Sequence, residues 1–192
     1  MRALVVVALA VVTSGCATVG GRLFGPRLPY EARVWLLDAE EDLMTARARA
    51  EQAERDVVRA QASLAAADQR CEALRDSPLE REAKAAAAVE AARVVREERS
   101  FDLLAAQAGC AERRYAAARA RAEVKFKVEG ADEAEANALA ERAEACAAKL
   151  DKRELALTEA EEQLARARAA RERESIAAAA QAPLEHPRPW LE

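Results

Sequence analysis

The chain has 192 residues, a net charge of −4, 33% charged residues, 52% hydrophobic residues and only 4% aromatic residues. Alanine supplies the largest share of the apolar content, with 52 copies. The single histidine, His186, lies in the last seven residues. This composition excludes histidine-based nucleophilic catalysis and histidine metal clusters, so we expect no enzyme, no cofactor and no metal site. Charges of both signs alternate along the chain, which argues against a one-sided basic surface for nucleic acid.

Residues 1–15 have the three parts of a secretory signal peptide. Residues 1–2 give a basic start, residues 3–12 an unbroken apolar run, and residues 13–15 (Thr-Ser-Gly) a group of small side chains. The apolar run is too short to span a bilayer, which takes about 20 residues. We therefore expect a signal peptide that is removed, rather than a membrane-spanning helix.

Residues 12–16, with the sequence Val-Thr-Ser-Gly-Cys, resemble the lipobox of bacterial lipoproteins. The resemblance implies cleavage before Cys16 and attachment of a lipid to its sulfur, which would hold the chain on a membrane. Ala17 follows in place of the Asp that retains such proteins at the inner membrane, so the resemblance implies the periplasmic face of the outer membrane. The alternative is an ordinary signal cut after Gly15 or Ala17, with Cys16 an incidental thiol. Residues 16–29 hold three glycines and two prolines, which predicts a flexible tether.

Residues 30–75 contain no glycine or proline, and one heptad register fits them throughout. The a positions are Leu36, Leu43, Ala50, Val57, Leu64 and Cys71, and the d positions are Ala39, Ala46, Ala53, Ala60, Ala67 and Leu74. All twelve are apolar, and all the neighbouring e and g positions are polar. Six such heptads predict a coiled-coil helix whose alanine-rich seam allows close approach of a second helix.

A second helix is expected over residues 78–129. Ser77 offers a cap, Pro78 suits the first position, and Glu80 suits a capping box that reaches back to the Ser77 amide. Its apolar seam keeps the seven-residue spacing, but Glu90 and Glu97 interrupt the companion positions. Such a broader stripe is typical of a middle helix that faces two neighbours.

A third helix is expected over residues 132–180, beginning at an Asp132 cap after Gly130. Its seam is apolar except for Arg153, with a positions at Ala136, Ala143, Leu150, Leu157 and Leu164 and the remaining d positions at Leu139, Cys146, Ala160 and Ala167. Residues 182–192 form a tail punctuated by prolines.

These patterns predict an all-α fold, a long antiparallel alanine-rich coiled coil over residues 30–181, most simply an up-down-up three-helix bundle. One alternative is a hairpin that completes its seam by dimerising, so a homo-oligomer is also envisaged. Another is a loosely folded tract that reflects composition bias, although bias alone does not place twelve apolar residues on one stripe. A tightly packed rod of this kind is expected to leave no cavity of the size that ligands occupy.

Two further sets of residues are candidates for function. Cys110 and Cys146 lie 20 residues before and 16 residues after Gly130, so an antiparallel pair brings them to similar heights and makes them a disulfide candidate, while Cys71 stays unpaired. The alternative is three small buried hydrophobic residues. In the tail, Trp190 between Pro189 and Leu191 is a candidate for docking a partner. The alternatives are that the tail packs on the end of the helices, or that it is disordered and has no role.

Together these features predict a lipid-anchored periplasmic coiled-coil protein that spaces or scaffolds components of the cell envelope and has an envelope protein as partner. The alternative is an accessory subunit of a transport or secretion assembly. Residues 46–54, which alternate Ala, Arg and Glu, resemble the helical hairpins of membrane-fusion adaptors, but no β-rich segment flanks them.

Overall fold

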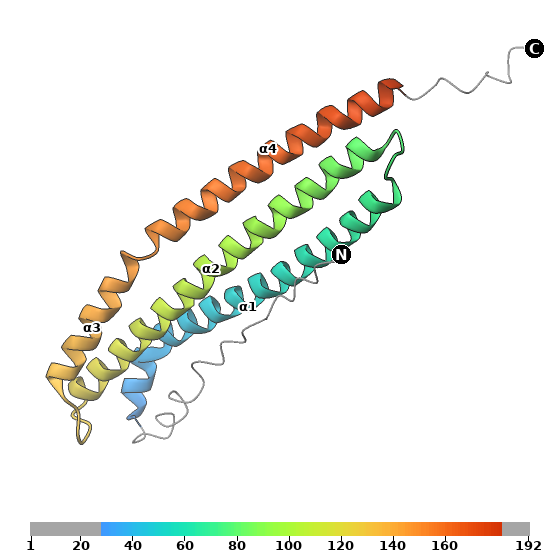
Figure 1. Cartoon of the computed structure of the whole chain (residues 1–192). Coiled ribbons are helices and arrows are strands. Elements are labelled where there is room, and N and C mark those ends of the chain that lie inside the picture. Colours follow the sequence, from blue (N-terminus) through green and yellow to red (C-terminus); the bar gives the residue numbers. More distant parts are fainter. Residues whose placement is uncertain (1–27, 182–192) are drawn as a thin grey trace, which may run out of the picture.

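The computed structural model describes residues 28–181, and this part of the chain is almost entirely helical, with no strand. The helices are α1 (Tyr30–Ala73), α2 (Glu80–Lys125), α3 (Glu133–Ala147) and α4 (Asp151–Gln181). Figure 1 shows three long rows of helix, with α1 and α2 side by side and α3 and α4 following each other along α2. The all-α prediction is therefore confirmed.

Neighbouring rows run in opposite directions, as contacts between residues far apart in sequence show. Between α1 and α2, Glu40 bonds to Tyr115, and Arg47, further along α1, bonds to Glu112, which comes earlier in α2. The two helices therefore run antiparallel. Between α2 and the third row, Cys110 is joined to Cys146 and Arg96 lies near Glu161. In the described range, the extensive helix packing always involves α2, because α1 packs on α2 but not on α3 or α4. The arrangement is thus a layer with α2 in the middle, rather than a three-helix bundle closed on all sides.

The heptad register expected for the first helix matches the burial of α1. All twelve a and d positions are buried or half-buried, and Leu36, Ala32 and Ala60 are almost completely covered. Ala32 and Leu36 form a small core with Ala122 of α2, against which Leu28, Ala118 and Phe126 pack. Because six of these twelve seam residues are alanine, many of the contacts bury little area, and the stability of the pair is spread along its length.

The turn between α1 and α2 differs in detail from the expected capping box. α2 begins at Glu80. Ser77 Oγ donates to the Leu74 carbonyl at 2.6 Å, at the end of α1, and accepts from the Leu79 amide at 3.3 Å, just before α2. Glu80 does reach back, but its carboxylate accepts from the amide of Asp76 at 2.9 Å rather than from Ser77. Asp76 adopts a left-handed backbone (φ 62°) within this turn.

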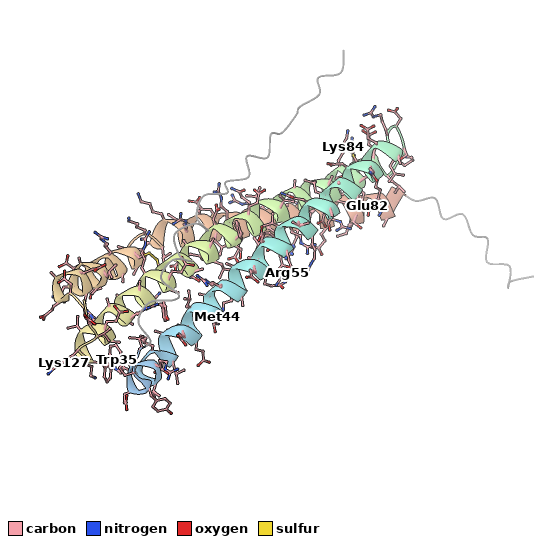
Figure 2. All side chains as sticks on the ribbon, turned by 90° about the horizontal axis from the view of Figure 1, so that it is seen from below. Trp35, Met44, Arg55, Glu82, Lys84 and Lys127 are labelled. Carbon is pink, nitrogen blue, oxygen red and sulfur yellow. A yellow bond between two sulfur atoms is a disulfide. The ribbon has the colours of Figure 1, made fainter. Side chains whose placement is uncertain are left out.

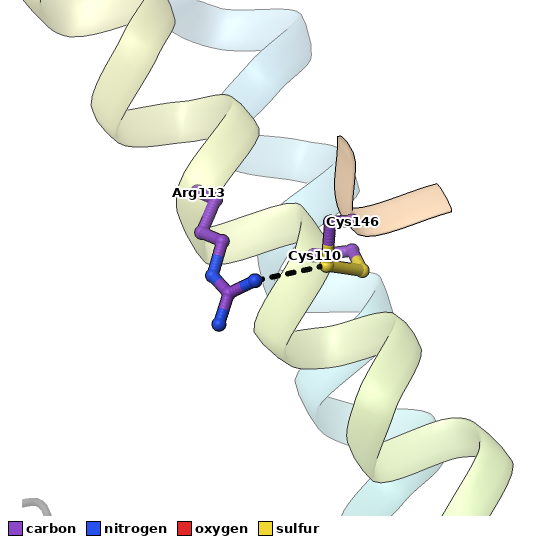
Figure 3. The surroundings of a disulfide bond; sticks show 3 residues. All are labelled: Cys110, Arg113 and Cys146. Carbon is purple, nitrogen blue, oxygen red and sulfur yellow. Dashed lines mark hydrogen bonds between the residues drawn. A yellow bond between two sulfur atoms is a disulfide. The ribbon is translucent and has the colours of Figure 1, made fainter. Parts of the chain in front are cut away.

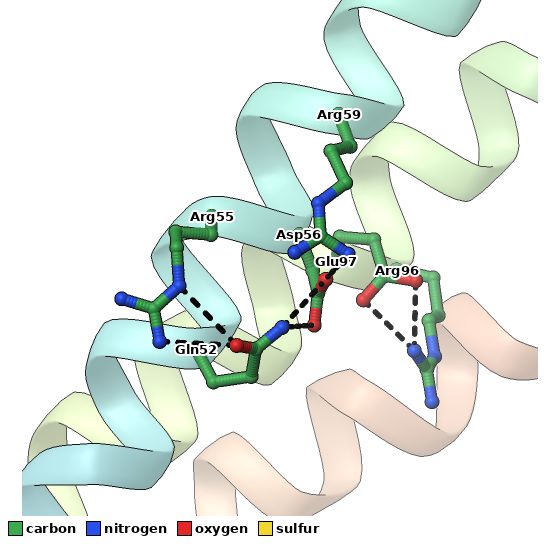
Figure 4. A network of polar contacts seen from close by, with 6 residues as sticks. All are labelled: Gln52, Arg55, Asp56, Arg59, Arg96 and Glu97. Atoms are coloured by element: carbon green, nitrogen blue, oxygen red, sulfur yellow. Dashed lines mark hydrogen bonds and ion pairs between the residues drawn. The ribbon is translucent and has the colours of Figure 1, made fainter.

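The two carboxylates that interrupt the α2 seam are half-buried in the structure. Glu97 accepts from Arg96 Nη1 at 2.8 Å through both oxygens, and Arg96 also lies 3.7 Å from Glu161 of α4. Figure 4 shows this pair beside the α1 residues Gln52, Arg55, Asp56 and Arg59, which are linked to one another by hydrogen bonds and an ion pair. This pairing lowers the cost of placing Glu97 near an apolar seam, whereas Glu90 Oε2 is buried without a hydrogen bond and has Arg93 3.6 Å away.

α2 ends at Lys125, four residues earlier than expected, and a turn leads into α3. Lys127 and Gly130 both have positive φ, 53° and 79°, so the chain reverses within a few residues. Asp132 caps α3 as its sequence position predicts, accepting from the Ala134 amide at 2.8 Å.

The third helix is not continuous, and in this respect the prediction of one helix over residues 132–180 is wrong. It breaks between Ala147 and Asp151, where the amides of Lys149 and Leu150 bond to carbonyls three residues back instead of four. Arg153, the one charged residue on the expected seam, lies just after the break and is exposed. No glycine or proline marks this site. The tighter turn lets Arg153 stay in solvent while Leu150 and Leu157 remain half-buried.

Two adjacent leucines of α1 provide a test of the packing. Leu36 is 1% exposed and Leu37 is 55% exposed. We expect Leu36→Ala to lower the free energy of unfolding by about 2 to 5 kcal/mol, because it removes a fully covered side chain from the contact with Ala122. The same change at Leu37 should cost less than about 0.5 kcal/mol. Chemical denaturation followed by circular dichroism measures both, and equal losses would contradict the assignment of the α1 seam.

Candidate functional site

The most distinctive chemical feature of the described residues is the link between α2 and α3. Cys110 and Cys146 form a disulfide with their Cα atoms 5.6 Å apart, and both side chains are buried. Figure 3 shows the bond between the two helices, with Arg113 of α2 reaching the sulfur of Cys146. The distance from Arg113 Nη1 to Cys146 Sγ is 3.4 Å. Cys71, on α1, is a half-buried free thiol.

The heptad pattern positions these cysteines. Cys146 occupies a d position near the end of α3, and Ala143, one turn earlier, packs with Ala140 and Ala117 of α2. These alanines allow the helices to approach closely, so that two side chains as short as cysteine can meet. The bridge joins α2 to α3 at Cys146, one residue before α3 ends at Ala147.

A groove of about 510 Å³ lies beside the bridge, open to solvent. Its lining combines three cations with a floor of small apolar residues: Arg113, Arg142, Lys149, Ala116, Leu139 and Ala145, together with Glu112. Glu112 is already bound to Arg47 of α1 at 2.7 Å, so the groove has an excess of positive charge. Such a lining suits an anionic group that carries some apolar surface. The one carboxylate of the lining, that of Glu112, is already paired with Arg47.

A second groove, of about 360 Å³, has a wall on each of the three rows of helix. Its floor is mainly alanine from α2 and α3, and its charged lining residues are Arg114, Arg121 and Glu144. Trp35 of α1 forms one wall, and Lys125 Nζ lies 5.2 Å from the centre of its ring. The expectation of a rod without cavities is therefore wrong for this end of the molecule. Because α1 and α3 lie on different sides of α2 without packing on each other, the helix surfaces between them stay open.

Sequence reasoning did not single out the charged residues of these grooves. The signal was present for two of them, since Arg142 and Lys149 are seven residues apart and both occupy g positions beside the α3 seam. Arg113 follows Cys110 by three residues, which places it on the same side of α2. The lipidation candidate, Cys16, and the docking candidates, Pro189, Trp190 and Leu191, lie outside the described residues.

Local contacts shift the pKa of side chains at the start of α2 and in the α1–α2 interface. At the start of α2, Lys84 binds Glu80, which lowers the pKa of the Glu80 carboxyl and raises the pKa of the Lys84 ammonium. In the α1–α2 interface, burial raises the pKa of Tyr115, and the hydrogen bond that its hydroxyl donates to Glu40 at 3.1 Å adds to the effect.

Within residues 28–181, no group of three or more His, Cys, Asp or Glu side chains is arranged to hold a metal ion. Over the same range, no helix combines the length and the apolar character needed to cross a membrane. Comparison of the chain with known protein families, with curated proteins and with solved structures gave no match.

Removal of the bridge should loosen α3. The variant Cys110→Ser/Cys146→Ser is expected to lose about 2 to 4 kcal/mol of unfolding free energy, because the bridge closes a loop with a sequence separation of 36 and the apolar core beside it is small. Cys71→Ser is the matched control and should lose less than about 1 kcal/mol. Denaturant titration gives the free energies, and hydrogen exchange should show the faster opening in α3. Equal losses in the two variants would argue against a stabilising bridge.

The phenol of Tyr115 should ionise above its ordinary pKa of about 10. Because the folded-state pKa is raised, the stabilisation from this group is complete below pH 10 and is lost as the pH rises through the folded-state pKa. The difference between the ultraviolet titration curves of the unaltered chain and Tyr115→Phe isolates this group. Glu40→Gln should move the titration back toward pH 10, and a Tyr115 midpoint at or below 10 would contradict the assigned contact.

Proposed function

We propose that this protein is a lipid-anchored periplasmic coiled-coil protein that spaces or scaffolds components of the bacterial cell envelope. The observation that carries the proposal is the length of the helical layer that follows the expected tether. α2 alone has 46 residues, about 69 Å at 1.5 Å per residue. A layer of long helices held by alanine seams is suited to reach and contact, since its surface is large relative to its core.

The anchor in this proposal is Cys16. Lipidation of this residue would place the chain on the periplasmic face of the outer membrane, with residues 17–29 as the connection to α1. We propose no enzymatic activity, no cofactor and no nucleic-acid partner. An envelope protein is the proposed partner.

A second candidate function is that of an accessory subunit in a transport or secretion assembly. The antiparallel pair of α1 and α2 supports it, because membrane-fusion adaptors use such a hairpin. The third row of helix on the other side of α2 gives this chain an additional surface that a simple hairpin does not have. Co-purification with an outer-membrane channel would favour this candidate, whereas recovery with cell-wall components would favour a scaffold.

The anchor is tested with Cys16→Ser in the full chain expressed in a bacterium. We expect the unaltered chain in the membrane pellet, carrying an acyl adduct by mass spectrometry, and the variant in the soluble periplasmic fraction, because each acyl methylene contributes about 0.8 kcal/mol to membrane binding. Cys71→Ser is the control and should stay with the membrane. Retention of the Cys16 variant in the pellet, or the absence of an acyl adduct on the unaltered chain, would refute the lipid anchor.

A further inference from the structure

α1 carries a second apolar stripe on the side away from α2. Its members follow one another at spacings of mostly three or four residues and are all exposed. We call them the outer stripe: Tyr30, Val34, Leu37, Met44, Ala48, Val58, Ala62 and Ala65. Tyr30 is 70% exposed, Met44 65% and Val58 61%, values unusual for a helix with polar surroundings. Figure 2 shows α1 at one edge of the molecule, with Met44 and Arg55 labelled along it.

Three charged residues interrupt the outer stripe, and their order along the helix is informative. Glu41 lies seven residues before Ala48 and Arg55 lies seven residues after it, at the same heptad position. Along the edge of the stripe, Asp38 and Arg59 repeat this order, with the acid first and the base second. The third, Glu51, is exposed beside Gln52. The acids Asp38 and Glu41 therefore precede Ala48, the bases Arg55 and Arg59 follow it, and Glu51 is the one acid of this set beyond Ala48.

We propose that the outer stripe is the interface between two copies of this chain, packed antiparallel about a two-fold axis at Ala48. In that arrangement Val34 of one copy lies level with Ala62 of the other, and Leu37 lies level with Val58. Glu41 lies level with Arg55, and Asp38 with Arg59. Each pairing occurs twice because of the symmetry. Ala48 meets Ala48 at the axis, where its small side chain lets the helices approach closely.

Charge determines the orientation of the pair. Packed in parallel and in register, the stripe would set Glu41 against Glu41, Glu51 against Glu51 and Arg55 against Arg55, and all three contacts are repulsive. The antiparallel register replaces the first and last of these by opposite charges. In the described chain Glu41 has no ion-pair partner, and Arg55 bonds only to the neutral Gln52, so both groups are available to a second copy.

The pairing does not depend on the lipid anchor, and it gives the scaffold a defined shape. The two copies of Tyr30 would lie about 54 Å apart along the helix axis. The tethers of the two copies would thus leave from opposite ends of the α1–α1 contact.

Site-specific crosslinking tests the register. The full chain with Cys71→Ser as background receives Ala48→Cys, and the exported protein, purified in mild detergent, is treated with a short bis-maleimide. We expect a covalent dimer, because the two thiols meet at the axis. The matched variant Ala62→Cys lies on the same stripe, but its two copies would be about 42 Å apart, so it should give no dimer. Background protein without a new cysteine corrects for any reaction of Cys16.

Crosslinking of both variants would overturn the antiparallel register in favour of a parallel pair. Crosslinking of neither would refute the interface. Because both positions are exposed alanines on one helix, circular dichroism should show the same thermal unfolding for the two variants, and this comparison excludes misfolding as the cause of a negative result.

Charge reversal provides an independent test through the dimer dissociation constant, measured by analytical ultracentrifugation in the same detergent. Glu41→Arg or Arg55→Glu alone should raise the constant about tenfold, since each places two like-charged pairs in the interface. The double variant Glu41→Arg/Arg55→Glu should restore it to within about threefold. No change in the single variants, or no recovery in the double variant, would show that the two residues do not face each other.

Discussion

Close approach of α2 to neighbours on two sides is the constraint on which the rest of this structure depends. Alanine makes it feasible, because a helix with small side chains on two faces can sit between two others without voids. Ala122 meets Ala32 and Leu36 of α1 on one side, and Ala117 meets Ala140 and Ala143 of α3 on the other. Each contact is weak, since a methyl group buries little area, and the layer is held by their number. A short alanine seam would not offset the conformational entropy that is lost when the helices become ordered, which explains why the helices are long.

The disulfide and the ion pairs supplement this weak but extended packing at defined points. The bridge fixes α3 on α2 beside a small cluster of alanines, and Arg47 with Glu112 and Tyr115 with Glu40 tie α1 to α2 near the same end. Exposed pairs of this kind contribute little energy individually, but they set the register between the helices. The same end of the molecule holds both grooves, so the grooves lie close to the disulfide and to these contacts between α1 and α2.

The sequence predicted some features of this arrangement well and others not at all, for physical reasons. The α1 seam was readable because an uninterrupted heptad leaves one consistent solution, and the blurred stripe of α2 correctly indicated a helix with two neighbours. Counting from Gly130 brought Cys110 and Cys146 to similar heights, and the structure places them together. No glycine or proline marks the break after Ala147 in the sequence. The charged Arg153 on the expected seam was the only sign of a change in the helix there. The grooves were not predicted because their walls come from helices far apart in the sequence, two in the first groove and three in the second, and the spacing of these helices is a property of the assembled layer.

The covalent bond between α2 and α3 has a mechanical consequence for the chain when it is pulled. If tension is applied between the start of α1 and the end of α4, the force passes directly from Cys110 to Cys146 and bypasses the turn between them. The residues between Cys110 and Cys146 cannot be extended until the disulfide is broken. The bridge therefore shortens the fully extended chain by about 120 Å. The oxidised protein is therefore a less extensible strand than its reduced counterpart, and thiol chemistry sets how far it can stretch.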